Sequence, residues 1–119
     1  MTYRYFHDPD NKTVYQIPNE PDVIEQKDRK TGRIIRWTVR MHIALTRADN
    51  VFLNNHWKHA CGELRSQEFD ANRYSRELAV SYFLTNNTPK CDEINQDTYK
   101  SLKSEYEIQS SANIYDINL

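Results

Sequence analysis

The chain has 119 residues, a formal net charge of −1, and a composition that is 38% hydrophobic and 12% aromatic, with eight tyrosines. Its length suits one domain around one core, and its aromatic content argues against intrinsic disorder. The near-neutral charge gives no whole-protein reason to bind nucleic acid or an anionic membrane, and it excludes the strongly acidic surface of a DNA mimic.

The N-terminal half is predicted to form about four antiparallel strands over residues 2–45. Aromatic and β-branched residues flank the polar segment 7–11, so Thr2–Phe6 and Thr13–Ile17 are expected to pair as a hairpin. A third strand is expected at Val23–Lys27, after two prolines, and Gly32 marks the turn that follows it.

The clearest pattern in the sequence follows Gly32. Every second residue from Ile35 to Leu45 is apolar, and the residues between the first five are polar: Arg36, Thr38, Arg40 and His42. Six matches to a period of two predict a long strand with one buried face.

Beyond residue 45 the spacing changes, and about three helices are predicted over residues 48–108. Thr46 and Asp49 resemble a capping box, and Leu53 and Trp57 begin an apolar stripe, so we expect a first helix at about Ala48–Arg65. These two apolar residues are the expected cover for the buried face of the long strand.

A second helix is expected to be capped by Asp70, with Tyr74, Leu78 and Tyr82 on its inner side. A third, starting near residue 92 or 97, extends through Tyr106. Residues 109–119 are expected to fray or to add a short strand. Residues 1–119 are therefore predicted to be a single α+β domain, in which an antiparallel meander packs against C-terminal helices.

Two cysteines, Cys61 and Cys91, stand in a chain without an apolar N-terminal stretch. We therefore expect a cytoplasmic protein with reduced thiols, no membrane contact and no cofactor.

One candidate site is a possible metal site on the first predicted helix. At helical spacing His56, His59 and Glu63 fall on one face, and two imidazoles with a carboxylate suit zinc. The spacing matches no established metal signature, so the alternative is a solvated helix flank.

A second candidate site lies on the polar face of the long strand and in the turn before it. Its residues are Lys30, Arg33, Arg36, Arg40 and His42. They belong to the segment 27–47, whose seven basic residues and one acid give a formal charge of +6, whereas residues 92–119 hold six acids and two lysines. Such a face can neutralise phosphates of nucleic acid, or it can be solvated or paired with the acidic C-terminal segment.

The sequence gives little support for a catalytic function. It contains no nucleophile-elbow motif, and its two glycines are too few for a phosphate-binding loop. We therefore expect a non-enzymatic binding protein that occupies a surface of a protein or of a protein–nucleic acid complex. Small domains of this kind are common among accessory and inhibitor proteins of phages and mobile elements. The alternatives are a nucleic-acid-binding module that uses the basic face, and a metal-binding domain.

Overall fold

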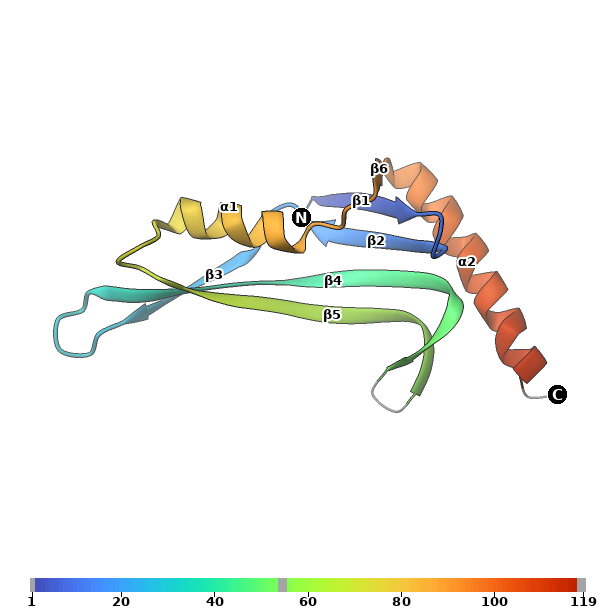
Figure 1. Cartoon of the computed structure of the whole chain (residues 1–119), viewed down its shortest axis with the longest axis horizontal. Coiled ribbons are helices and arrows are strands. Elements are labelled where there is room, and N and C mark those ends of the chain that lie inside the picture. Colours follow the sequence, from blue (N-terminus) through green and yellow to red (C-terminus); the bar gives the residue numbers. More distant parts are fainter. Residues whose placement is uncertain (1, 54–55, 118–119) are drawn as a thin grey trace.

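The computed structural model describes the backbone of residues 2–53 and 56–117, and the side chains of residues 2–49 and 60–110. Within these residues the chain forms an α+β fold of one six-stranded antiparallel sheet and two helices. The molecule is long and thin, measuring 63 × 32 × 22 Å (Figure 1).

The sheet is organised around one long strand. The strands are β1 (Tyr3–Asp8), β2 (Thr13–Pro18), β3 (Asp22–Lys27), β4 (Ile34–Leu53), β5 (His56–Asp70) and β6 (Asp92–Ile94), and the helices are α1 (Arg76–Asn87) and α2 (Gln96–Ile117). On one edge of β4, β3 pairs with its first part and β2 with a later part, while β5 pairs with its other edge. The second edge of β2 pairs with β1, which in turn pairs with β6.

Helix α1 covers one face of β4 and β5. Alternate residues of β4 point to this face, and they meet two buried residues of the helix, Ala79 and Phe83. The buried members of this core are Phe6, Ile17, Trp37, Val39, Met41, Ile43, Phe69, Ala79 and Phe83. Trp37 is satisfied within it, because its indole N–H donates to the carbonyl of Tyr74 at 2.9 Å.

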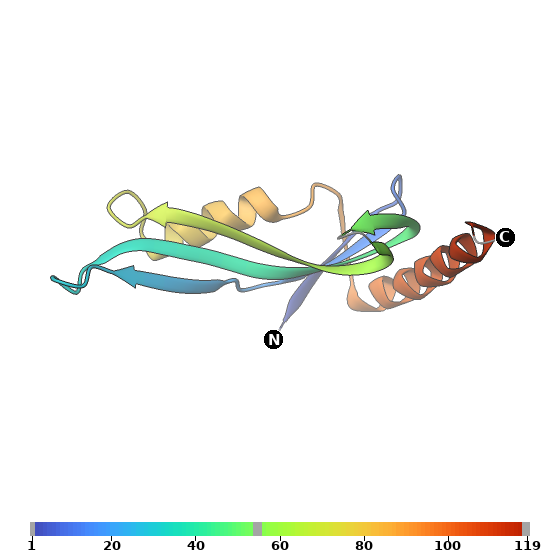
Figure 2. The same cartoon turned by 90° about the horizontal axis from the view of Figure 1, so that it is seen from below.

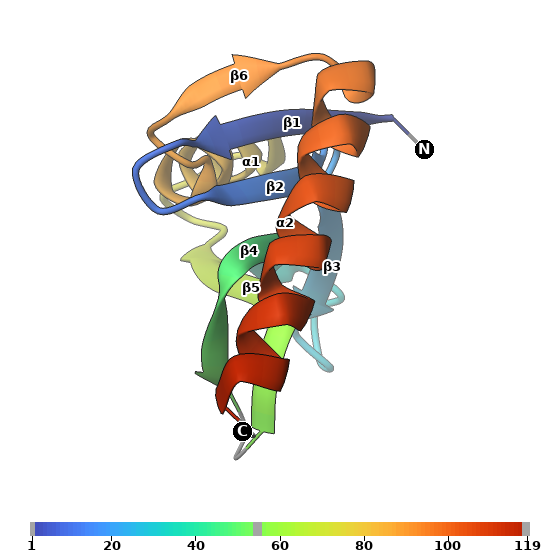
Figure 3. The same cartoon turned by 90° about the vertical axis from the view of Figure 1, so that its right-hand side faces the viewer.

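Helix α2 covers the opposite face, at the other end of the sheet. Figure 3 shows it crossing β1, β2 and the later part of β4. Its Tyr99 and Tyr106 are buried against Val14 and Ala48, and the ring of Tyr99 lies 4.6 Å from that of Tyr5. Neither α1 nor the described part of α2 combines the length with the apolar composition that crossing a bilayer requires.

The predicted strands of the N-terminal half are confirmed, with β4 longer than expected. They do not form the predicted meander, because β2 and β3 both pair with β4 and not with each other. The predicted helix at Ala48–Arg65 is wrong, because this segment forms the end of β4 and most of β5. The two strands pair from Arg36 with Asp70 to Leu53 with His56. Antiparallel pairing over this length satisfies the backbone groups that the two strands turn toward each other, and it overrides the local helical spacing.

The cover of the long strand also differs from expectation. Leu53 and Trp57 were expected to cover it, but Phe83 and Ala79 of α1 do so, and the side chains of the two expected residues lie outside the described part of the chain.

Helix α1 begins later than Asp70. Its N-cap is Ser75, whose hydroxyl oxygen accepts a bond from the backbone N–H of Leu78 at 3.2 Å. The Asp70 carboxylate instead accepts from the N–H of Asn72 at 2.9 Å and shapes the turn before the helix. Leu78 and Tyr82, expected on the inner side, are 43% and 49% exposed.

The third predicted helix corresponds to α2, which begins at Gln96 and continues to Ile117. Residues 109–117 are therefore helical, neither frayed nor a strand. The short strand β6, which pairs with β1, was not predicted.

Candidate functional site

One half of the sheet has a face that neither helix covers. In Figure 2, which looks onto this side, α1 lies behind β4 and β5, and α2 lies at the other end of the sheet. We call this surface the open face. Its residues share the side of the sheet given by the pairing registers: Asp22, Ile24, Gln26, Arg36, Thr38, Arg40, His42, Gly62, Leu64, Ser66, Glu68 and Asp70. All of them except the half-buried Thr38 are exposed.

Three of the predicted site residues, Arg36, Arg40 and His42, lie together on the open face, as the alternation of the strand predicted. The face itself is not basic, because these two arginines stand among three acids, Asp22, Glu68 and Asp70, for a formal total of −1. Directly opposed side chains on a sheet interact. These acids, which lie on the strands beside the arginines, were missed from the sequence because they belong to neighbouring strands.

Arg36 is engaged with its neighbours on both sides. Its guanidinium donates to the side-chain oxygen of Gln26 at 3.2 Å and lies 3.8 Å from the carboxylate of Glu68. These partners come from β3 and β5, not from the acidic C-terminal segment that was the expected alternative. Arg40 has no ion pair within the described part of the chain, so it is the more available of the two.

A hollow lies at the centre of the sheet, beside Arg40 and His42. Pro18 and Pro21 bracket the break between β2 and β3, and proline cannot donate a backbone hydrogen bond. The registers therefore leave the edge of β4 unpaired between Arg40 and Ala44.

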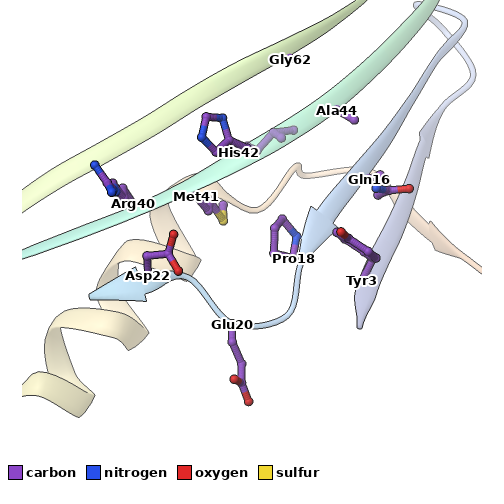
Figure 4. Close-up of a pocket in the computed structure, with 11 residues that line it drawn as sticks. Tyr3, Gln16, Pro18, Glu20, Asp22, Arg40, Met41, His42, Ala44 and Gly62 are labelled. Carbon is purple, nitrogen blue, oxygen red and sulfur yellow. The ribbon is translucent and has the colours of Figure 1, made fainter. Parts of the chain in front are cut away.

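The hollow at this break has a volume of about 340 Å³. Figure 4 shows Asp22 and Arg40 at one end of it and Tyr3 and Gln16 at the other. A hollow of this size, with an aromatic ring, charges of both signs and an amide on its walls, can receive a side chain of a partner.

The other two predicted residues, Lys30 and Arg33, lie away from the hollow, in the turn between β3 and β4. About nine residues of extended chain, roughly 30 Å, separate Arg33 from His42. The five residues therefore do not form one compact site.

We call this end of the molecule the basic tip, formed by Arg29, Lys30, Arg33 and Arg73, all of which are exposed. Arg33 reaches the turn before α1, where its guanidinium donates to the side-chain oxygen of Asn72 at 3.5 Å. The carboxylate of Asp28 accepts from the backbone N–H groups of Lys30 and Thr31, which fixes the turn. The tip thus gathers cations from two separate segments, one of which the sequence did not indicate.

The metal-site hypothesis loses the helix on which it depended. His56, His59 and Glu63 lie on β5, so helical spacing does not group them. The two histidine side chains lie outside the described residues. Among the described side chains, no three His, Cys, Asp or Glu residues come together in a way that could hold a metal ion.

The thiol of Cys91 lies at the margin of the core. Cys91 packs against the core that α1 covers, and burial, followed by the carboxylates of Asp8 and Asp92, raises the pKa of its thiol. A thiol with a raised pKa stays protonated and is a poor nucleophile at neutral pH. This environment suits a packing role.

Leu64 and Glu68 are open-face residues that sequence reasoning missed. Both were assigned to or placed beside a helix, whereas β5 carries them on one side at a period of two. One signal was present in the sequence, because asparagine, which occurs twice in Asn54-Asn55, is a residue favoured in turns.

No protein-family model, no curated protein and no solved structure matches this chain.

Proposed function

We propose that this chain is a non-enzymatic binding protein that occupies a surface of a macromolecular partner through its open face. The observation that carries the proposal is the uncovered half of the sheet. There β3, β4 and β5 present one continuous, exposed surface, while α1 buries the reverse side in a core. A face held rigid from behind loses little conformational freedom when it binds.

Exposed apolar side chains support this role for the open face. Ile24 is 43% exposed and Leu64 52% exposed, on strands that flank β4. With the hollow between β2 and β3, they provide apolar contacts and a recess within a polar surround. Interfaces between proteins commonly have this arrangement.

The charges of the open face favour a protein partner over a phosphate backbone. Arg36 and Arg40 are matched by neighbouring acids, so the surface carries both signs at short range. Mixed charge of this kind selects a complementary protein surface, whereas phosphate binding requires an excess of cations. An inhibitor protein that a phage or mobile element encodes acts by covering such a surface of its target. That role stays a prediction for this chain.

The proposal is tested by capture of partners from a host lysate with matched variants. Ile24→Arg on the open face and Leu78→Arg on α1 introduce the same charge at sites that are both 43% exposed. We expect Ile24→Arg to lose a protein that the wild type retains after nuclease treatment and in moderate salt, and Leu78→Arg to keep it.

Equal retention by the two variants, or turnover of a substrate by the wild type that is lost on changing Cys61, would contradict the proposal.

The second candidate function is nucleic-acid binding through the basic tip. It is favoured by the gathering of Arg29, Lys30, Arg33 and Arg73, of which Arg73 pairs with Asp70 at 4.0 Å, and by Asp28 in the turn, whose carboxylate is already bonded to backbone N–H groups. Clustered exposed cations neutralise phosphates and release counterions.

Two double substitutions, one in the basic tip and one on the open face, distinguish the two candidate functions. A double change, Lys30→Glu with Arg33→Glu, is expected to abolish binding to DNA and RNA at low salt if the tip contacts phosphate. Arg36→Glu with Arg40→Glu is the matched charge change on the open face. If neither pair alters nucleic-acid binding, or the wild type shows none at low salt, this second function is excluded.

A further inference from the structure

Strand β5 has one edge without a strand partner in the described chain. It pairs with β4 along its length, and Figure 2 shows it as the outermost strand on its side of the sheet. An exposed strand edge presents backbone N–H and C=O groups that can pair with another strand. Over residues 60–70 the register with β4 runs without a shift, so this edge is regular.

The side chains of β5 favour pairing with β5 of a second copy of the chain. When two identical strands pair antiparallel, two opposed residues turn their backbone groups either both toward the partner strand or both away from it, so their numbers have an even sum. Centring the pair on Leu64 sets Glu63 of each copy opposite Arg65 of the other. Leu64 then meets Leu64, and its 52% exposed side chain becomes buried.

The neighbouring registers are worse. Centring the pair on Glu63 opposes two carboxylates, and centring it on Arg65 opposes two guanidinium groups. Like charges directly across a strand pair are destabilising. Centres at Gly62 or Ser66 avoid repulsion but set neither the opposite charges nor the two leucines face to face.

Helix α1 lies to one side of the proposed centre of the strand pair. The helix lies over the later residues of β5, where Asn87 accepts from Arg65 at 3.5 Å and Asn86 donates to Gln67 at 3.4 Å. A two-fold axis through Leu64 and perpendicular to the sheet carries the second α1 to the other side of that axis. The two helices therefore lie over different lengths of the strand pair.

From this geometry we infer that two copies of the chain associate through β5, antiparallel and centred on Leu64, into one continuous sheet. In the single chain Glu63 and Arg65 pair with each other along the strand, at 2.8 Å. In the dimer each lies directly across from its counterpart in the second copy. The paired segment is short, so association is expected to be weak and to depend on concentration. Leu64 belongs both to the open face and to this dimer contact, but the inference does not depend on which partner the open face binds.

Charge exchange tests the inference by sedimentation velocity over a concentration series. The wild type should approach twice the monomer mass. Glu63→Arg alone and Arg65→Glu alone should each weaken association by on the order of tenfold or more, because each sets like charges opposite one another. An equimolar mixture of these two variants should recover the dimer, since every opposed pair is then of opposite sign. A monomeric wild type, or a mixture that behaves as its separate components do, overturns the inference.

A crosslink tests the register. In a background of Cys61→Ser and Cys91→Ser, Leu64→Cys should give an oxidised dimer, because opposed residues in a strand pair lie within the span of a disulfide. Ser66→Cys is the matched control and should stay monomeric, since four residues, roughly 13 Å, separate the two copies of this position. Crosslinking at position 66 but not at 64 overturns the proposed register. Circular dichroism confirms that each variant is folded.

Discussion

The two ends of the sheet are each covered by one helix, but on opposite faces. Where β3, β4 and β5 pair, α1 covers one face and the other face is open. Where β1, β2 and the later part of β4 pair, α2 covers the side that is open at the first end. A strand of 20 residues extends about 66 Å, whereas helices of 12 and 22 residues extend about 18 and 33 Å. Neither helix is long enough to cover β4, so an uncovered face follows from the lengths of the elements.

The largest expected effect tests whether α1 holds its end of the sheet together. Phe83→Ala removes a fully buried ring and should lower the free energy of unfolding by about 3–5 kcal/mol. Tyr82→Ala, one residue earlier and 49% exposed, should cost much less. Urea unfolding followed by circular dichroism measures both. Equal losses would mean that α1 does not bury the face assigned to it.

A matched pair of isoleucines compares the two faces of the same end. Ile43→Ala on the buried side should cost about 2–5 kcal/mol of unfolding free energy, because it leaves a cavity in the core. Ile24→Ala on the open face should cost a small part of that, since its side chain is 43% exposed. The comparison fails if the Ile24 variant is as unstable in urea as the Ile43 variant.

At the other end of the sheet, α2 is held partly by polar contacts. The hydroxyl of Tyr106 lies 2.7 Å from Nε2 of His7, so Tyr106→Phe should lower the free energy of unfolding by about 1 kcal/mol. Tyr3→Phe, at an exposed position, serves as the control and should leave the urea midpoint unchanged. Equal urea midpoints for the two variants would mean that this hydrogen bond does not stabilise the packing of α2.

The smallest effect should appear at alkaline pH. Burial raises the pKa of Tyr99 and of Tyr106 above the ordinary tyrosine value of 10.0. The unfolded chain therefore loses these protons first, so stability present below about pH 10 declines as the pH rises through the folded values. The urea midpoint of the wild type should fall over this range, and Tyr99→Phe should fall less. An identical decline in both proteins would locate the titrating groups elsewhere.

The strands of the N-terminal half and the presence of α1 and α2 could be predicted from the sequence, because these elements have local signals. The alternation from Ile35 to Leu45 also correctly placed Arg36, Arg40 and His42 on one side of β4. The hairpin of β4 with β5 was missed, since its stability comes from pairing between residues as distant as Arg36 and Asp70. Glu68, Asp70 and Leu64 of the open face depend on that pairing and could not be placed without it.

The outermost pairing of the sheet has a consequence for the order of folding. Strands β4 and β5 are neighbours in sequence and can pair as soon as both are made. Strand β6 meets β1 across almost the whole chain, and the ion pair of Arg4 with Glu93 joins residues 89 positions apart. Long loops close slowly, so we expect the outer edge of β1 to stay unpaired until most of the chain has been synthesised. A chain that ends before Asp92 would keep that edge permanently, and its tendency to aggregate should rise.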